Sequence, residues 1–224
     1  MKKMFRYSFS LPLLLLPLLM SAQEADTVQA SKSVSLGFDL TGPVLYALDN
    51  TGYNYEGHLS YRLNYKYYLV CEPGLSSYTY EQYNYKYSSH GWFIRLGTDI
   101  GMLAPVASKI NYFAGIGLRY GLAVFEQETP DVSVKNYWGE VNTSIPANTV
   151  HAHFLEVQGS IKTEIFRNFL IGWAVKLRTP VYSSGRKEKK AIYIPGMGLT
   201  DSSFTPAFSY YIIYRFPLGN SSGE

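Results

Sequence analysis

Residues 112–124, YFAGIGLRYGLAV, decide the fold of this 224-residue chain. Large apolar residues alternate there with glycine or a charged residue: one face carries Tyr112, Ala114, Ile116, Leu118, Tyr120, Leu122 and Val124, and the other carries Gly115, Gly117, Arg119 and Gly121. A period of two residues predicts a β-strand with one apolar face. A strand of this length is also long enough to cross a bilayer when tilted.

The same alternation recurs along the chain, at residues 33–41, 55–63, 66–77, 91–101, 155–164, 169–178 and 208–216. The stretch at 66–77 is the least regular, because Val70 shares a face with Glu72. No window keeps a helical period for long. The composition agrees, since 16% of the residues are aromatic and 19 are glycine, which favours strands and turns. We therefore expect an all-β chain of about eight strands.

Three features favour a membrane wall over a soluble sandwich. The less apolar face is rich in glycine rather than thoroughly charged, and aromatic residues lie near the strand ends. The strands are about as long as a tilted span requires. Short connections near 64–65, 102–108 and 167–168 alternate with long ones at 43–54, 78–90, 126–150 and 182–203. The prediction is a transmembrane, antiparallel, up-and-down β-barrel with long loops outside the cell, and a secreted or periplasmic sandwich or lipocalin-like binding protein is the alternative.

The N-terminus predicts export. Lys2, Lys3 and Arg6 precede an apolar run at 11–19, which is too short for a membrane-spanning helix and holds two prolines. We expect a signal peptide over 1–22, a periplasmic lead-in over 23–32, the barrel over 33–218 and a polar tail over 219–224. The expected location is the outer membrane of a Gram-negative bacterium, reached through a cleaved signal peptide.

Charge and cysteine content exclude other classes. Without the three basic residues of the leader, 17 basic residues face 17 acidic ones, which gives no electrostatic case for a nucleic-acid partner. The single cysteine, Cys71, permits no internal disulfide and is expected to face lipid as a small apolar residue.

The inward face of the predicted barrel collects ionisable residues: Asp39, Glu56, Glu72, Asp99, Glu156 and Glu164 with Arg62, Lys66, Arg95, Arg119, Lys162, Lys176, Arg178 and Arg215. Eight strands leave an interior only wide enough for side chains. An unpaired charge inside such walls costs several kcal/mol, so pairing is nearly obligatory. We expect these residues to interlock as a polar plug, and a narrow gated ion path is the alternative.

Histidine is the residue type that could support catalysis here. The chain has His58, His90, His151 and His153, and the last two lie near Ser144 and Glu156 in sequence. No Gly-x-Ser-x-Gly or comparable motif frames a nucleophile, and no histidine pair has zinc-ligand spacing. We therefore predict no catalytic residue, no cofactor and no metal, with a lipid A-modifying barrel enzyme as the alternative.

Two predicted outer loops are candidates for surface binding, one through tyrosines and one through a basic run: Tyr78, Tyr80, Tyr83, Tyr85 and Tyr87, and Arg186, Lys187, Lys189 and Lys190. Tyrosine offers a large amphipathic contact surface, and basic residues can meet lipopolysaccharide phosphates. The alternative is that the tyrosines extend strands above the membrane and the basic residues are solvated. Expected partners are outer-membrane lipid and lipopolysaccharide, the outer-membrane assembly machinery and an unidentified surface ligand.

Several segments carry a resemblance to known barrels: residues 36–40 (LGFDL) with Gly42-Pro43, 113–121 (FAGIGLRYG), Tyr137-Trp138, 167–173 (RNFLIGW), 193–198 (YIPGMG) and 214–218 (YRFPL). The chain resembles the small outer-membrane barrels of the OmpA-transmembrane and OmpX type in strand number and loop alternation. It more closely resembles a Bacteroidota family of outer-membrane-type barrels known only as a domain of unknown function. These motifs are structural, so the resemblance implies the barrel fold and a structural or surface-binding role without any named activity.

Overall fold

The computed structural model describes residues 32–48, 52–82, 85–103, 112–136, 139–184 and 191–218. The chain divides into two compact units, Met1–Ala30 and Ser31–Glu224, and all described residues belong to the second. The predicted signal peptide, nearly all of the lead-in and the tail at 219–224 lie outside the described residues.

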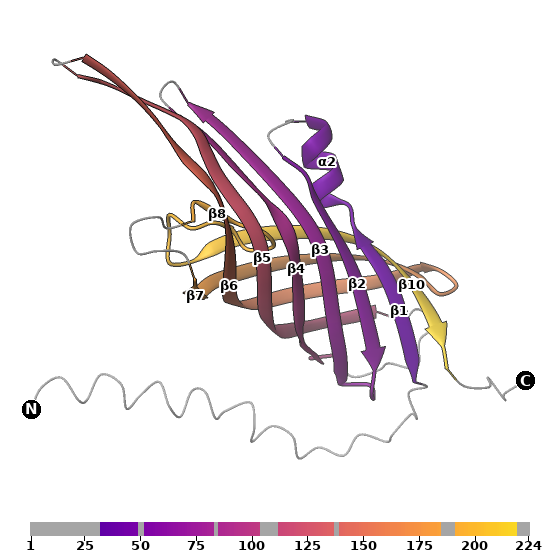
Figure 1. Cartoon of the computed structure of the whole chain (residues 1–224). Coiled ribbons are helices and arrows are strands. Elements are labelled where there is room, and N and C mark those ends of the chain that lie inside the picture. Colours follow the sequence, from indigo (N-terminus) through magenta and orange to yellow (C-terminus); the bar gives the residue numbers. More distant parts are fainter. Residues whose placement is uncertain are drawn as a thin grey trace, which may run out of the picture. The chain divides into compact units, whose positions relative to one another are not determined.

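Eight strands of the described chain close into one antiparallel barrel (Figure 1). They are β1 (Ser33–Asp39), β2 (Asn54–Arg62), β3 (Tyr67–Gln82), β4 (Tyr85–Gly101), β5 (Tyr112–Asn136), β6 (Gly139–Phe166), β7 (Phe169–Ser183) and β10 (Thr205–Pro217). Each strand pairs with its neighbours in the chain, and β1 pairs with β10 to close the ring. The predicted eight-stranded, up-and-down barrel is therefore confirmed.

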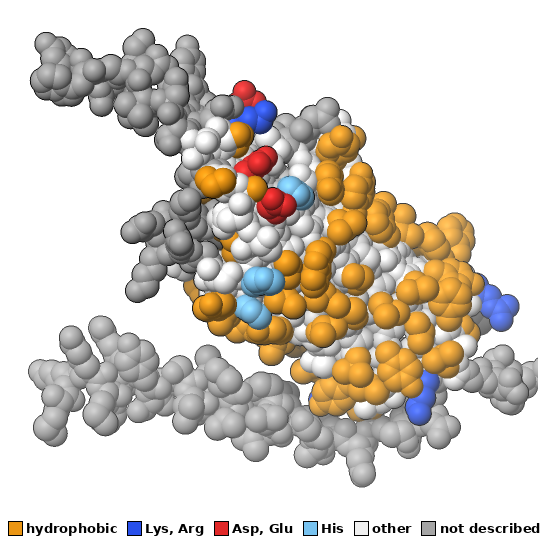
Figure 2. Space-filling model, in the orientation of Figure 1, with side chains coloured by type: hydrophobic (Ala, Val, Ile, Leu, Met, Phe, Trp, Pro, Cys, Tyr) orange, Lys and Arg blue, Asp and Glu red, His pale blue; other side chains and the backbone are white. Residues whose placement is uncertain are grey.

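The barrel wall is apolar outside and polar inside. Leu118 on β5 is 56% exposed and Val175 on β7 is 61% exposed, whereas Arg119 beside Leu118 is fully buried. Figure 2 shows hydrophobic side chains spread over the visible face of the wall. This distribution is the reverse of a water-soluble barrel and is that of a membrane-spanning one. Cys71 lies on the outer face as predicted, since it pairs in register with the exposed Leu59 and Leu96.

Two of the predicted long loops are strands instead. The hairpin of β3 and β4 continues to Gln82 and Tyr85, and that of β5 and β6 to Asn136 and Gly139. Both hairpins project well beyond the short edge of the barrel at β1 and β2 (Figure 1). The prediction of loops at 78–90 and 126–150 was wrong because strand pairing continues above the apolar wall, where the sequence still alternates, as in Val132-Ser133-Val134-Lys135.

A short helix, α2 (Thr41–Leu48), occupies the first long connection. The Asp39 carboxylate accepts a hydrogen bond from the backbone N–H of Thr41 at 2.8 Å and so caps the first turn. Thr41 was expected to end the first strand, but the cap makes it the first helical residue. None of the helices in the described ranges is long and apolar enough to cross a membrane.

The last long connection folds back into the barrel mouth. Its strands β8 (Tyr193–Ile194) and β9 (Gly198–Leu199) pair to form a small turn, and we call residues 191–200 the mouth hairpin. Gly196 and Gly198 have φ angles of 73° and 106°, a backbone region that only glycine adopts without strain. The other predicted part of this connection, the basic run at 186–190, lies outside the described residues.

Candidate functional site

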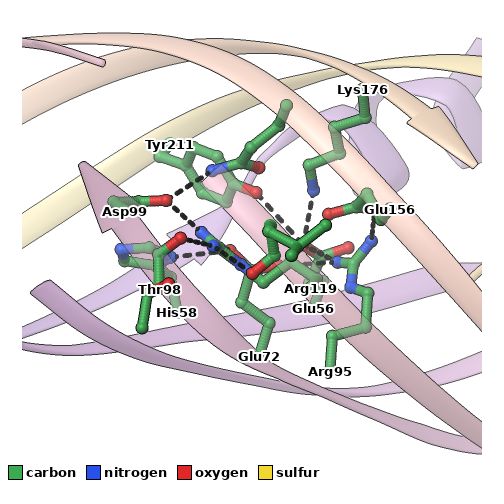
Figure 3. A network of polar contacts seen from close by, with 12 residues as sticks. Glu56, His58, Glu72, Arg95, Thr98, Asp99, Arg119, Glu156, Lys176 and Tyr211 are labelled. Carbon is green, nitrogen blue, oxygen red and sulfur yellow. Dashed lines mark hydrogen bonds and ion pairs between the residues drawn. The ribbon is translucent and has the colours of Figure 1, made fainter. Parts of the chain in front are cut away.

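A buried polar cluster, which we call the central network, crosses the barrel lumen (Figure 3). All strands of the barrel except β1 contribute to it: Glu56 and His58 from β2, Glu72 from β3, Arg95 and Asp99 from β4, Arg119 from β5, Glu156, Gln158 and Lys162 from β6, Lys176 and Arg178 from β7, and Tyr211 from β10. Each residue occupies an inward position of its strand, because side chains alternate across a sheet.

Arg95 is the centre of one half of the network. Its Nη1 lies 2.7 Å from Glu156 Oε2, and its Nη2 contacts Glu56 and lies 3.3 Å from Glu72 Oε2. Lys176 Nζ also reaches Glu56 Oε1 at 2.9 Å. These five side chains are at most 1% exposed. One guanidinium therefore joins carboxylates from three strands.

Asp99 and His58 organise the other half. Arg119 Nη2 lies 2.7 Å from Asp99 Oδ1, and Lys162 Nζ lies 3.4 Å from Asp99 Oδ2. The His58 ring lies between Glu72 Oε1, 3.0 Å from Nδ1, and the Lys162 ammonium, 3.3 Å from Nε2. An ammonium can only donate, so Nε2 must accept and Nδ1–H must donate to Glu72. His58 thus acts as a neutral link between an acid and a base.

The charges of the central network nearly balance. Its four carboxylates face five basic side chains, which leaves a formal charge of +1 with His58 neutral. Each of the nine groups has at least one oppositely charged partner within 4.0 Å. Removing one partner from a buried pair typically costs about 3–5 kcal/mol, because the remaining charge stays desolvated. The network therefore links strands across the lumen, and loss of any one partner should destabilise the barrel.

The lumen nearer the mouth is filled by apolar side chains instead. Residues of the mouth hairpin pack there against inward side chains of β4, β5 and β6: Ala191, Ile194 and Met197 against Phe93, Ala123, Phe125, Val150, Ala152 and Phe154. This apolar filling stands beside the polar plug that the sequence predicts. Glycines on neighbouring strands make room for the rings, since a methyl group on Gly121 would overlap the Phe154 ring.

Polar contacts fix the mouth hairpin in place. Arg178 Nη1 of the central network donates to the Met197 carbonyl at 3.3 Å. The Tyr193 hydroxyl bonds to Ser76 Oγ at 2.7 Å, and its ring stacks on Tyr78 with 4.6 Å between centroids. Burial raises the pKa of Tyr193, and the bond to Ser76 opposes that change. The hairpin is therefore tied both to β3 and to the network beneath it.

A cleft of ≈ 470 Å³ opens between the mouth hairpin and the extension of β3. Its lining is mostly apolar with a few polar groups: Tyr78, Tyr80, Ala191, Ile192, Leu199, Thr200 and Asp201. This volume and composition are typical of small-ligand pockets.

The structure separates the predicted lumen residues into three places. Glu56, Arg95, Asp99, Arg119, Glu156, Lys162, Lys176 and Arg178 meet in the central network, together with Glu72. Asp39 instead caps α2 at the end of β1, although it pairs in register with Tyr211 of the network. Arg62 and Arg215 lie at the opposite end of the barrel, where Arg215 pairs with Glu164 at 3.4 Å, and Lys66 lies over the Tyr67 ring at the same end.

Sequence reasoning missed three members of the network. His58, Gln158 and Tyr211 were left out because the prediction considered only formally charged side chains, yet all three occupy inward positions of alternating strands. Tyr211 donates to Glu56 at 3.2 Å and Gln158 donates to Asp99 at 3.3 Å. Applying the same alternation to uncharged polar residues would have found them.

The tyrosines proposed for surface binding do not form one surface. Tyr78 and Tyr80 line the mouth cleft, but Tyr87 is only 3% exposed and its hydroxyl donates to Gln127 Oε1 at 3.2 Å. Tyr87 was misplaced because it follows the inward register of β4. Tyr83, the side chain of Tyr85 and the basic residues Arg186, Lys187, Lys189 and Lys190 lie outside the described residues.

The two histidines near the mouth, His151 and His153, lie apart from Glu156. His153 lies on the outer face, where Nδ1 is 2.6 Å from the Tyr120 hydroxyl oxygen, and His151 is exposed on the same face. Glu156 points to the opposite side of β6, into the central network. Within the described ranges, no three His, Cys, Asp or Glu residues are grouped so that they could hold a metal ion.

Comparisons with known proteins give a family and a set of distant structural similarities. The family described as Domain of unknown function (DUF6048) matches residues 4–221. No curated protein sequence matches the chain. Among solved structures, it is similar to CarO of Acinetobacter baumannii, with 10% identity and a TM-score of 0.35 over 85% of this chain and 98% of that one.

Two further solved structures show a comparable similarity. A major outer membrane protein from Thermus thermophilus has 13% identity and a TM-score of 0.45 over 84% of this chain and 100% of that one. Ail, the attachment invasion locus protein of Yersinia pestis, has 10% identity and a TM-score of 0.36 over 84% and 98%.

Proposed function

The chain belongs to the family described as Domain of unknown function (DUF6048), and we propose that it is a closed outer-membrane barrel with a structural or surface-binding role at its outer end. The observation that carries the proposal is the filling of the lumen. The central network occupies one part and the mouth hairpin another, and Arg178 connects them. A barrel blocked in this way serves as an anchor and not as a channel.

The outer membrane is the location that the wall and the leader support together. An apolar wall without free strand edges suits a bilayer, and a basic leader with a short apolar run suits export. Outer-membrane lipid and lipopolysaccharide then contact the exposed side chains, and the outer-membrane assembly machinery inserts the strands. The projecting hairpins face outward and the turn at Asn64 faces the periplasm, following the usual asymmetry of such barrels.

Planar-bilayer recordings test the closed interior. The unmodified protein, refolded and inserted, should give no steady conductance, while a porin of about 16 strands in the same bilayers should conduct. Heat-modifiable gel mobility of the same preparation shows that the barrel is folded. A steady conductance level in the unmodified, folded protein would overturn the proposal.

Cysteine labelling tests the orientation. In a Cys71→Ser background, Leu199→Cys marks the mouth hairpin and Leu63→Cys marks the turn region at the other end; both leucines are similarly exposed, at 41% and 44%. A maleimide that cannot cross membranes should label Leu199→Cys on intact cells. It should label Leu63→Cys only after the outer membrane is permeabilised. The opposite pattern would reverse the topology.

The mouth cleft is the place where we propose that an external ligand binds. Its tyrosines offer apolar contact area, and Asp201 and Thr200 offer polar groups. Purified lipopolysaccharide, added to the refolded Leu199→Cys protein in micelles, should slow maleimide labelling if it occupies the cleft. Equal labelling rates with and without lipopolysaccharide would show that lipopolysaccharide does not occupy the cleft. The mouth would then have a structural role only.

A further inference from the structure

Three basic side chains converge on a small cavity at the end of the barrel away from the mouth hairpin. The cavity of ≈ 40 Å³ is lined by Arg62, Lys162 and Arg215, with Ser35, Ser60 and Tyr68 among its other walls. None of the described residues that line it is acidic. Figure 2 shows the same bias at the surface, where basic side chains and no acidic ones are visible at this end of the wall.

The carboxylates near this cavity are already engaged. Asp99 lies 3.4 Å from Lys162 but is held more closely by Arg119, at 2.7 Å. Glu164 lies 3.4 Å from Arg215 and also accepts a hydrogen bond from the Asn168 backbone at 2.7 Å.

Arg62 has even less negative charge near its guanidinium. Its Nε donates to the Asn64 carbonyl at 3.3 Å, and the described part of the chain places no carboxylate within ion-pair distance of its guanidinium. Among the described residues, two shared carboxylates therefore offset three cations around the cavity. The electrostatic potential inside it is positive.

Aromatic rings hold two of these cations in place. The Arg62 guanidinium lies 5.7 Å from the centre of the Tyr68 ring, and the Lys162 ammonium lies 5.2 Å from the centre of the Phe113 ring. The two rings contact each other edge to face, with 5.0 Å between centroids. A ring face attracts a cation without neutralising it. The cations are thus ordered before any anion arrives, which lowers the entropic cost of binding one.

We propose that this cavity binds a phosphate-type oxyanion. Three cations and the hydroxyl groups of Ser35 and Ser60 provide donors around one small space, and a tetrahedral anion can use more of them than a carboxylate can. The anion is either inorganic phosphate or the phosphate of a small headgroup such as glycerol phosphate. Calling this end periplasmic rests on the proposed function, whereas the binding of the anion does not.

Calorimetric titration of the refolded protein in an uncharged detergent and phosphate-free buffer tests the site. Inorganic phosphate should give a saturable heat with one site per chain, and acetate should bind more weakly. Binding of sn-glycerol 3-phosphate at least as tight as that of phosphate would assign the site to a headgroup, and weaker binding would assign it to the free ion. Absence of a saturable heat with either phosphate would overturn the proposal, as would an equal effect of sodium chloride at matched ionic strength.

Charge-removing variants locate the anion. Arg62→Gln and Arg215→Gln should each weaken phosphate binding by about tenfold or more, because each removes a charged donor. Arg62→Lys should keep part of the affinity. Lys66→Gln is the matched control, since Lys66 lies at the same end of the barrel but outside the cavity. This variant should bind phosphate as tightly as the unmodified protein does. Unchanged affinity in both Arg variants would refute the assignment.

The unfolding midpoint without phosphate separates binding from a structural role. Arg62→Gln should be as stable as the unmodified protein or more stable, because it relieves repulsion among like charges, and it should lose the stabilisation that phosphate adds. A lower midpoint with unchanged phosphate affinity would make Arg62 a structural residue only. A conducting barrel would refute the closed interior without changing the expected phosphate affinity, so the two proposals fail separately.

Discussion

Replacing Arg95 by methionine should destabilise the barrel strongly, and the contacts of Arg95 show which carboxylate would be left without a close basic partner. Methionine keeps the aliphatic part of the side chain but removes the guanidinium that joins Glu56, Glu72 and Glu156. Glu56 retains Lys176 at 2.9 Å, and Glu156 retains Arg178 at 2.7 Å.

Glu72 is the carboxylate that would lose its nearest basic partner. After the substitution it would keep only neutral His58 at 3.0 Å and Arg119 at 3.8 Å. Leaving a buried carboxylate in this state costs about 3–5 kcal/mol of unfolding free energy. With a urea m-value of about 2 kcal/mol per M, the midpoint should fall by about 1.5–2.5 M.

Urea unfolding of the refolded protein in micelles, followed by tryptophan fluorescence and gel mobility, measures this shift. Glu126→Gln is the control, because the pair of Glu126 with His90 is about half exposed and such pairs contribute about 0–1 kcal/mol. The double variant Arg95→Met with Glu72→Gln should recover most of the loss. A midpoint shift for Arg95→Met no larger than that of the control, or a double variant as unstable as the single one, would refute the reasoning.

Three further changes test other parts of the barrel. Gly196→Ala should cost about 1–3 kcal/mol in the same urea assay, because alanine strains a backbone at φ 73° and its methyl group overlaps a buried ring, while Gly159→Ala, whose methyl group meets nothing within 4 Å, should leave the midpoint unchanged. Tyr193→Phe should lower stability by about 0.5–1.5 kcal/mol through loss of one hydrogen bond, and an unchanged midpoint would show that the hairpin does not depend on it. Replacing His151 and His153 together by alanine should leave lipid A acylation unchanged, and altered acyl chains in lipid A mass spectra would favour the enzyme alternative.

The sequence alone determines the class of fold because its signal is local. Side chains alternate across a strand, so residues 112–124 reveal both the strand and the face that meets lipid. The same rule places Glu56, Arg95 and Glu156 inside a barrel of eight strands. It also shows why an interior of that width must be filled by side chains.

Only the tertiary structure decides which inward residues meet. Arg95 and Glu156 are 61 residues apart, and Lys176 and Glu56 are 120 apart, so their contact depends on strand register and on height along the barrel. Height along the barrel also places Arg62 at the opposite end, whereas Asp39 is engaged by the first turn of α2. Alternation shows whether a residue faces the lumen or the outside, but not its height along the barrel. That height is set by pairing with distant strands.

The mouth hairpin is the clearest example of a feature that the sequence alone does not determine. Its sequence is turn-like and reads as an outer loop, yet Ile194 and Met197 are buried in the lumen against side chains of three other strands. The closed ring of strands creates an apolar space at the mouth that does not exist until the barrel has formed. A segment enters that space because it buries apolar area there, and no local pattern in the segment reports a cavity built by the rest of the chain.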